Sequence, residues 1–282
     1  MVPLSEIRQL SSIWNVPHST IEKDHALGHL LAAINLHFEE QLRFKGGTCL
    51  RKCYFPDYRF SEDMDFSSVR PDFLLSPSDL RLICKTAEEH SGIRYTPEPI
   101  QALQHKDIRK GDQVRIKYWG ANHSRNEPPP VPDRWLTKIK LEISTEEVLL
   151  LDEDNRSIYH PYTDTLIAEK PISCYAIDEI IAEKLRSLIQ RKYTASRDYF
   201  DLFNLTDGFS AADWSRIKLL FLEKMDHKGL KYAGPGQLVP PASIENVSKN
   251  WEQTIGHQIS NGSAIPSTQL INEVRQRILE HL

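Results

Sequence analysis

A Gly-Gly-Thr turn in the segment FKGGTCLRKCYF contains residue types suited to binding a phosphate group. Gly46 and Gly47 can expose backbone amides, because glycine adopts tight turns at little cost, and Thr48 adds a hydroxyl group. Residues 50–55 predict a helix whose N-terminus opens at the glycines, where free amides and the helix dipole favour an anion. A Gly-Gly pair is also a common turn, so this motif needs support from its neighbours.

Two aspartates follow the turn at a spacing that suits metal binding. Asp63 and Asp65 project from the same face of a strand, because side chains alternate along a strand. Met64 and Phe66 fall on the opposite face, which predicts a strand with one buried side and one side that carries carboxylates. An Asp-x-Asp pair can equally be a solvated strand face. Beside a phosphate-binding turn, it supplies what metal-assisted nucleotidyl transfer requires.

A third carboxylate, Glu142, lies in a strand pattern that would place it beside the first two. In the segment KIKLEIST, one face carries Ile139, Leu141 and Ile143, and the other carries Lys138, Lys140 and Glu142. We expect Glu142 to complete a three-carboxylate site with Asp63 and Asp65 if the two strands pair. Three carboxylates repel one another, so the arrangement makes sense chiefly with divalent cations bound. The alternative is an exposed acid on a strand.

An amphipathic helix from residue 177 carries a lysine on its apolar face. The apolar stripe consists of Ile177, Ile180, Ile181, Leu185 and Leu188. Lys184 projects into this stripe, where a charged amine is costly unless it meets an anion. It could reach the triphosphate of a nucleotide, or it could extend its amine past the edge of the core. Asp198 and Asp201, three residues apart, share a face of the next helix.

The pattern FKGGTCLRK…RFSEDMDF resembles the AbiEii/AbiGii toxin family, a branch of the nucleotidyltransferase superfamily that includes DNA polymerase beta and the aminoglycoside nucleotidyltransferases. The resemblance extends from about residue 21 to about residue 205. The superfamily pattern is Gly-Ser or Gly-Thr, then Asp-x-Asp or Asp-x-Glu, then a third carboxylate. The resemblance implies nucleotide binding by Gly46, Gly47 and Thr48 and metal binding by Asp63, Asp65 and Glu142. Many relatives have Asp at the place of Glu142.

The resemblance also includes the second lysine-containing segment. In the family, a Glu-Lys-Leu helix is typically followed by Arg-Asp-x-x-Asp, and its Lys and Asp are regarded as active-site residues. The matching residues here are Lys184 and then Arg197, Asp198 and Asp201. Either aspartate could instead pair with Lys184 or Arg197. We expect Lys184 and Asp201 in the site, with Lys184 on the triphosphate, and Asp198 paired structurally with a base.

The function implied by the resemblance is that of a metal-dependent nucleotidyltransferase toxin of a toxin–antitoxin, or abortive infection, system. Such an enzyme uses one or two Mg²⁺ ions and a nucleoside triphosphate, and its acceptor hydroxyl would be the 3′ end of tRNA. A cognate antitoxin, often a DNA-binding regulator from the same operon, is the implied partner. Two alternatives stay open: a small-molecule acceptor, as in aminoglycoside-modifying relatives, and a catalytically silent module that binds nucleotide or a partner.

Composition limits the class of protein without choosing its function. The 282 residues, 40% of them hydrophobic, can form a sizeable core in two domains. A net charge of −4 argues against a generally basic nucleic-acid-binding protein, so RNA contacts would depend on local patches such as residues 105–120. We expect no membrane span, no secretory signal and a cytoplasmic location, where the four cysteines stay reduced.

The elements expected around these motifs form an α/β (α+β) fold. A helix begins near Ser19, where Glu22 completes the spacing of a capping box. Further helices are expected at 72–89, 211–225, 244–254 and 267–282, and strands at 114–119 and 139–144. We expect a nucleotidyltransferase-like core with a mixed sheet over residues 1–170. A mainly helical domain over residues 171–282 would contribute Lys184 and Asp201 to the site.

Overall fold

A mixed β-sheet organises the first of two compact units in the computed structural model. The structure describes residues 1–121, 128–167, 170–191, 196–260 and 265–282. The first unit comprises residues 1–147 and 153–174, and the second comprises 148–152 and 175–282. The expected α/β fold class is confirmed, whereas the domain boundaries at 170 and 171 stay a prediction.

The sheet has eight strands within the described residues, and their order places the two acidic strands next to each other. The strands are β1 (Leu42–Lys45), β2 (Asp63–Ser68), β3 (Arg94–Pro97), β4 (Gln101–His105), β5 (Ile108–Trp119), β6 (Lys138–Ser144), β7 (Asp154–Arg156) and β8 (Ile172–Cys174). Their order is β3-β5-β6-β2-β1-β8-β7, and β4 pairs with β5 outside this path. β2 runs parallel to β6 and antiparallel to β1.

Alternation along β2 and β6 gives the centre of the sheet one apolar and one polar face. Met64 lies opposite Leu141, and Phe66 lies opposite Ile143; all four side chains are buried. The intervening polar residues therefore share the other face. This is the pattern that the sequence predicts for both strands.

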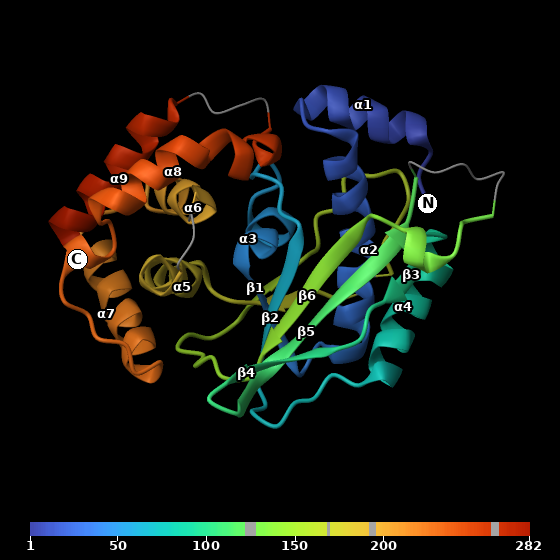
Figure 1. Cartoon of the computed structure of the whole chain (residues 1–282), viewed down its shortest axis with the longest axis horizontal. Helices are drawn as coiled ribbons and strands as arrows, with labels where there is room; N and C mark the ends of the chain where they lie inside the picture. Colours follow the sequence, from blue (N-terminus) through green and yellow to red (C-terminus); the bar gives the residue numbers. More distant parts are fainter. Residues whose placement is uncertain (122–127, 168–169, 192–195, 261–264) are drawn as a thin grey trace. The chain divides into compact units, whose positions relative to one another are not determined.

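The first unit contains the N-terminal helices and those that flank the sheet. They are α1 (Leu4–Trp14), α2 (His18–Phe38), α3 (Gly46–Cys49), the π-helical turn η1 (Leu50–Tyr54), α4 (Pro77–Ser91) and the 3-10 turn η2 (Pro132–Arg134). α2 packs against α4 and contacts β6, and Figure 1 shows these two helices along one side of the sheet.

The start of α2 differs from the expected capping box at Ser19. The helix begins at His18, and the residue before it, Pro17, makes no side-chain capping bond. Proline favours a position at a helix start because its φ is fixed and it lacks an amide hydrogen. A real capping box starts α4, where Ser76 and Asp79 each accept a bond from the other's backbone amide.

The second unit is helical throughout its regular elements. It contains α5 (Ile177–Gln190), α6 (Ser196–Leu205), α7 (Ala211–His227), the 3-10 turn η3 (Pro235–Gln237), α8 (Pro241–Thr254), the 3-10 turn η4 (Gly256–Gln258) and α9 (Ser267–His281). α5 packs against α6 and α7, and α6 packs against α8 and α9. Among the residues described, no helix combines the length and apolarity needed to cross a membrane.

Candidate active site

The three predicted metal ligands of the first unit share one face of two paired strands. Asp63 lies opposite Lys140 and Asp65 lies opposite Glu142 in the register of β2 and β6. The strands thus pair as the sequence predicts, and Glu142 stands beside Asp65 rather than on a separate edge. Each carboxylate is only partly buried, so the face that carries them remains accessible to a ligand.

Lys140 lies among these carboxylates. Its Nζ is 3.3 Å from Oε2 of Glu142 and 3.8 Å from Oδ2 of Asp63. Burial alone would lower the pKa of Lys140, but Asp65, Asp63 and Glu142 raise it above its usual value. Alternation along the strand predicts this lysine on the polar face beside the site, as positive charge near the carboxylates.

The carboxylates still repel one another despite the lysine. Burial raises the pKa of Asp65 to about 6; Lys140 opposes this rise, and Glu142 and Asp63 add to it. Lys45, opposite Asp65 on β1, also opposes the rise. Carboxylate oxygens clustered in this way are the ligands that Mg²⁺ prefers, so the residues present fit a divalent cation.

The Gly-Gly turn directly adjoins Asp65. Gly46 starts α3 with φ of +79°, a left-handed conformation that favours glycine. A Cβ atom at this position would lie only 2.7 Å from Oδ2 of Asp65. Lys45, the residue before the turn, lies opposite Asp65 in the register of β1 and β2. The absence of a side chain at Gly46 therefore leaves room for the carboxylate.

The second glycine of the turn accommodates an arginine. A Cβ atom at Gly47 would lie 2.6 Å from Nη2 of Arg59 and 3.1 Å from Oγ of Ser61. Arg59 is buried, and its Nη1 donates to the carbonyl of Phe60 at 3.1 Å. The residues just before the two aspartates thus pack directly against the turn.

The side chain of Thr48 has a different partner from the one expected. Its hydroxyl was predicted to face a phosphate, but it is buried and donates to the backbone carbonyl of Asp63. This bond ties α3 to the first residue of β2. The backbone amides at the start of α3 are the groups that suit an anion, since the first amides of a helix have no intrahelical acceptor. Nucleotide binding by Gly46, Gly47 and Thr48 stays a prediction.

Arg51 and Lys52, which follow the turn, form a buried ion-pair network. Nε of Arg51 lies 3.2 Å and Nζ of Lys52 lies 2.6 Å from the carboxylate of Asp24 on α2. The hydroxyl of Tyr162 also donates to Asp24, at 2.9 Å. Burial would raise the pKa of Asp24, but Lys52 and Arg51 lower it to about 2. Arg51 and Lys52 are therefore buried rather than solvated, and they pair with Asp24 rather than facing a phosphate. They anchor the helix that carries the turn.

Lys184 and Asp201 are paired within the second unit. Lys184, on α5, is buried and donates to the carboxylate of Asp201 on α6, which is fully buried. Its Nζ also lies 3.5 Å from Oδ1 of Asp198. Asp198 accepts in addition from Arg191, just beyond α5. Of the alternatives that the sequence leaves open for Lys184, the structure has the ion pair with Asp201. Catalytic roles for Lys184 and Asp201 stay predictions.

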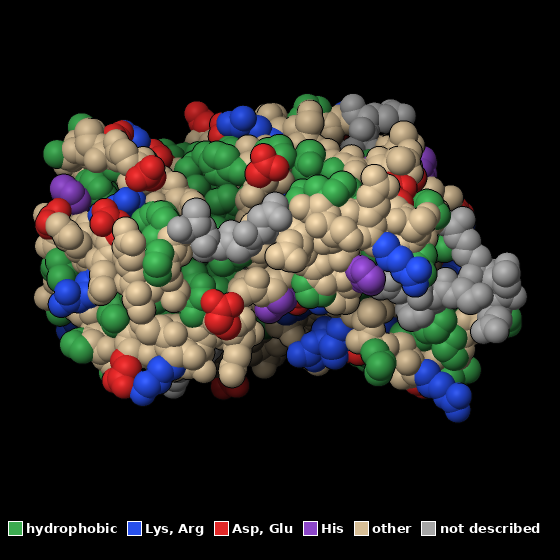
Figure 2. All heavy atoms as spheres, turned by 90° about the horizontal axis from the view of Figure 1, so that it is seen from above, with side chains coloured by type: hydrophobic (Ala, Val, Ile, Leu, Met, Phe, Trp, Pro, Cys, Tyr) green, Lys and Arg blue, Asp and Glu red, His purple; other side chains and the backbone are tan. Residues whose placement is uncertain are grey.

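The basic segment 105–120 forms most of the β4–β5 hairpin, and several of its cations face acids. Arg109 pairs with Asp112, and Lys110 pairs with Glu146. Lys117 lies 4.0 Å from Glu98. The contacts of these three cations with acids reduce the positive charge that the hairpin offers to RNA. Figure 2 shows another face of the molecule, on which acidic and basic side chains are interspersed among the residues drawn in colour.

Comparison with known proteins agrees with this geometry. Comparison with curated proteins finds no match. Among solved structures, the chain is similar to MenT4, a nucleotidyltransferase toxin from Mycobacterium tuberculosis H37Rv, with a TM-score of 0.62 and 18% identity over 100% of this chain and 91% of that chain. The family described as "Nucleotidyl transferase AbiEii toxin, Type IV TA system" matches residues 29–273. The chain therefore belongs to the AbiEii family of nucleotidyltransferase toxins.

Proposed function

We propose that this toxin transfers a nucleotide from a nucleoside triphosphate to an acceptor hydroxyl group in a Mg²⁺-dependent reaction. The observation that carries the proposal is the juxtaposition of Asp65 with both Glu142 and Gly46. Asp65 lies opposite Glu142 across the strand pair, and its Oδ2 lies 2.7 Å from the position that a Cβ of residue 46 would take. A carboxylate group and a helix-opening turn in direct contact suit a metal-bound polyphosphate.

In this proposal, Asp63, Asp65 and Glu142 hold one or two Mg²⁺ ions. Bound divalent metal would stabilise the negative charge that develops on the attacking and leaving oxygens. Lys140 lies close enough to two of these carboxylates to balance part of their charge. The acids position the ions, and the lysine limits the repulsion among the acids before the ions bind.

The nucleotide would be held by the turn and by a lysine of the second unit. Amides at Gly46, Gly47 and Thr48 point from the start of a helical segment that continues from α3 into η1. Family resemblance supports a role for Lys184 on the triphosphate and for Asp201 in the same reaction. Their buried pairing fixes the position of the lysine.

The acceptor that we propose is the 3′ end of tRNA, and the biological setting is a cytoplasmic toxin–antitoxin system with a cognate antitoxin. Family membership supports a toxin, and blocking tRNA aminoacylation would arrest growth. Because the cations of the β4–β5 hairpin are mostly near acids, RNA binding there would depend on a few side chains, and its salt dependence would be correspondingly shallow.

The test is incubation of the purified chain with total tRNA, Mg²⁺ and each α-labelled nucleoside triphosphate in turn. Asp65→Asn is expected to reduce label transfer by about 10²–10³-fold or more, because it removes a metal-binding oxygen charge. Asp72→Asn is the matched control, since Asp72 is an exposed aspartate paired with Arg70. It should retain full activity.

Two outcomes would redirect the assignment. Metal-dependent pyrophosphate release without labelled RNA would indicate a small-molecule acceptor. Nucleotide binding without pyrophosphate release from any mixture would indicate a silent binding module. Equal activity in Asp65→Asn and the unmodified chain would rule out the proposed active site.

A further inference from the structure

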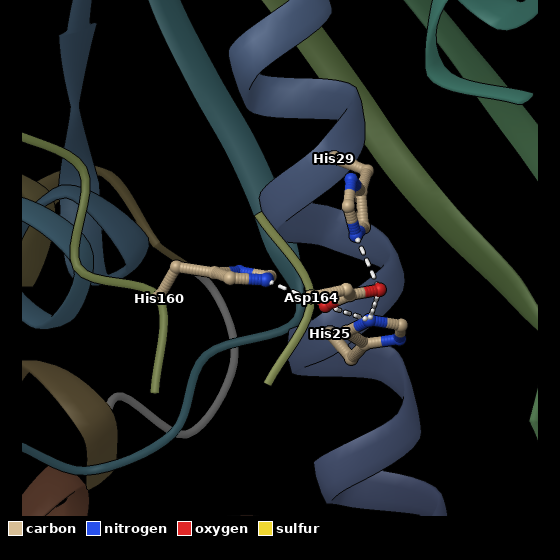
Figure 3. Close-up of side chains that lie close together, drawn as sticks. All are labelled: His25, His29, His160 and Asp164. Atoms are coloured by element: carbon tan, nitrogen blue, oxygen red, sulfur yellow. Dashed lines mark hydrogen bonds and ion pairs between the residues drawn. The ribbon is translucent and has the colours of Figure 1, made fainter. Parts of the chain in front are cut away.

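Three histidines and one aspartate converge in the first unit, apart from the residues assigned to the candidate active site. His25 and His29 come from α2, one turn apart, and His160 and Asp164 come from the irregular segment between β7 and β8. Figure 3 shows the three rings arranged around the carboxylate of Asp164. These four residues are called the histidine cluster below.

The ring nitrogens of the histidine cluster all approach the same carboxylate. Nε2 of His25 lies 2.9 Å from Oδ2 of Asp164, and Nε2 of His29 lies 3.3 Å from the same oxygen. Nε2 of His160 lies 2.9 Å from Oδ1. The four potential ligand atoms lie within 4.8 Å of one another. The amino group of Met1 also approaches Oδ2 of Asp164, at 3.4 Å.

The histidine cluster would be unfavourable for folding if the rings served only to form hydrogen bonds with Asp164. His25 and His29 are 0% and 1% exposed, and the side chain of His160 is 7% exposed. In all three rings, Nδ1 is buried and has no hydrogen-bond partner within the part of the chain that the structure describes. A buried polar nitrogen without a partner is unfavourable. Apolar side chains would fill the same space without that cost.

The packing of the rings matches the dimensions of a four-coordinate site. Ring centroids lie 4.9 Å apart for His25 and His29, 5.1 Å for His29 and His160, and 5.7 Å for His25 and His160. Three imidazoles bound tetrahedrally through Nε2 at about 2.0–2.1 Å would have centroids roughly 5.2 Å apart. The rings therefore already have the spacing that one shared ion would impose.

A glycine inside α2 allows this spacing. A Cβ at Gly28 would lie 3.2 Å from Nδ1 of His160, tighter than an ordinary contact. Glycine in a helix interior is unfavourable relative to alanine. At this position, the missing side chain of Gly28 lets His160 approach the surface of α2.

We propose that the histidine cluster binds one transition-metal ion of the zinc type through Nε2 of His25, His29 and His160 and the carboxylate of Asp164. Imidazole nitrogens with one carboxylate suit Zn²⁺, whereas Mg²⁺ prefers oxygen ligands, so this ion would differ from that of the active site. Four protein ligands close the site to substrate. The ion would be structural and would fasten α2 to the segment that leads into β8.

The first experiment uses Co²⁺ as a spectroscopic probe in the full chain after chelator treatment. The Asp65→Asn variant serves as the background, so that active-site binding is weakened. We expect one equivalent of Co²⁺, with the strong visible absorption of a four-coordinate nitrogen and oxygen site. His160→Ala and His29→Ala should each weaken binding by about 100-fold or more, beyond the 10–100-fold effect of second-shell changes.

Two controls separate this site from other binding. His37→Ala changes another histidine of α2, which bonds Thr86 instead, and should leave Co²⁺ binding unchanged. The thiols of Cys49, Cys53 and Cys174 also lie within 4.8 Å of one another and are the competing candidate. Thiolate ligation would produce intense near-ultraviolet absorption that Cys53→Ser removes. That spectrum, or Co²⁺ binding unaffected by the His160 variant, would overturn the proposal.

A second readout covers the possibility that ligand variants fail to fold. In the unmodified chain, ¹⁵N NMR of the imidazoles reports which ring nitrogen carries the proton. Without metal, Nε2–H donates to Asp164; with Zn²⁺ bound, the proton must reside on Nδ1. Transfer of the proton to Nδ1 in three rings on addition of one equivalent of Zn²⁺ is the expected result. Unchanged tautomers with excess Zn²⁺ would overturn the proposal.

Discussion

Nζ of Lys140 lies 3.3 Å from Oε2 of Glu142, two residues along the same strand face. The same nitrogen lies 3.8 Å from Asp63 on the neighbouring strand. The acidic face therefore contains its own cation, placed between β2 and β6 by their parallel register. In the metal-free protein, Lys140 offsets part of the repulsion among the neighbouring acids. Removal of this lysine should therefore affect the stability of the metal-free protein more than that of the metal-bound protein.

Lys140→Met is expected to destabilise the protein in chelator by on the order of 1–2 kcal/mol, because the carboxylates lose their compensating charge. Saturating Mg²⁺ should restore most of this loss. Urea unfolding with chelator and with Mg²⁺ measures both effects. Lys138→Met, on the same strand face but exposed, is the control and should show neither. A loss in chelator that Mg²⁺ does not reduce would contradict the role given to Lys140.

The raised pKa of Asp65 predicts a pH-dependent stability in the absence of divalent cations. Its folded pKa of about 6 exceeds its usual value of 3.8, so the fold favours the protonated acid. Stability from this group is therefore complete below about pH 4 and is lost as the pH rises through 6. The total change is on the order of 3 kcal/mol. Asp65→Asn should remove this slope in chelator, as measured by unfolding between pH 4 and pH 8. A slope that is unchanged in the variant would assign the effect to other groups.

Gly46→Ala is expected to damage both stability and activity. The left-handed backbone costs about 1–3 kcal/mol for a residue with a side chain, and the new methyl group would displace the carboxylate of Asp65. Gly208→Ala is a matched control, because Gly208 has φ of +70° with nothing within 4 Å of the added Cβ. Unfolding of both variants separates backbone strain from the steric effect. Equal losses of stability and no loss of transfer would show that the contact with Asp65 is unimportant.

The pair of Lys184 and Asp201 allows stability and catalysis to be tested separately. Asp201→Leu should cost about 3–5 kcal/mol, because it removes the closest partner of a buried charge. The double variant Lys184→Met and Asp201→Leu replaces the pair with apolar groups and should recover much of this loss. If Lys184 acts on the triphosphate, the double variant will be folded but inactive. Normal transfer by a folded double variant would restrict the pair to a structural role.

Local pattern was sufficient to predict the two acidic strands, but not their pairing. Strict alternation in β2 and β6 identified the polar face, and family resemblance supplied the reason to pair Glu142 with Asp65. The sequence pattern could not predict which groups the long side chains would contact. Arg51 and Lys52 look solvated on a helix, yet both are buried against Asp24, 27 and 28 residues earlier.

The histidine cluster could not be predicted from the sequence, because its members lie far apart along the chain. His25 and His29 have the i, i+4 spacing that would mark a helical metal site, but the other members of the cluster, His160 and Asp164, lie 131 or more residues later in a segment without regular structure. No periodicity predicts such an encounter. The partner of Lys184 was difficult for a different reason, since Asp198 and Asp201 share one helix face and only packing selects between them.

The pairing of β8 with β1 has a consequence for the order in which the chain is made. Phe44 of β1 lies opposite Cys174 of β8, so this strand edge waits for 130 further residues to be synthesised. At about 5–20 residues per second, the wait is roughly 6 to 26 s. Both acidic strands are available by residue 144, yet the sheet that supports them is completed only after Cys174 has left the ribosome. A growing chain of this toxin therefore carries its carboxylates for seconds before it can hold them in their final place.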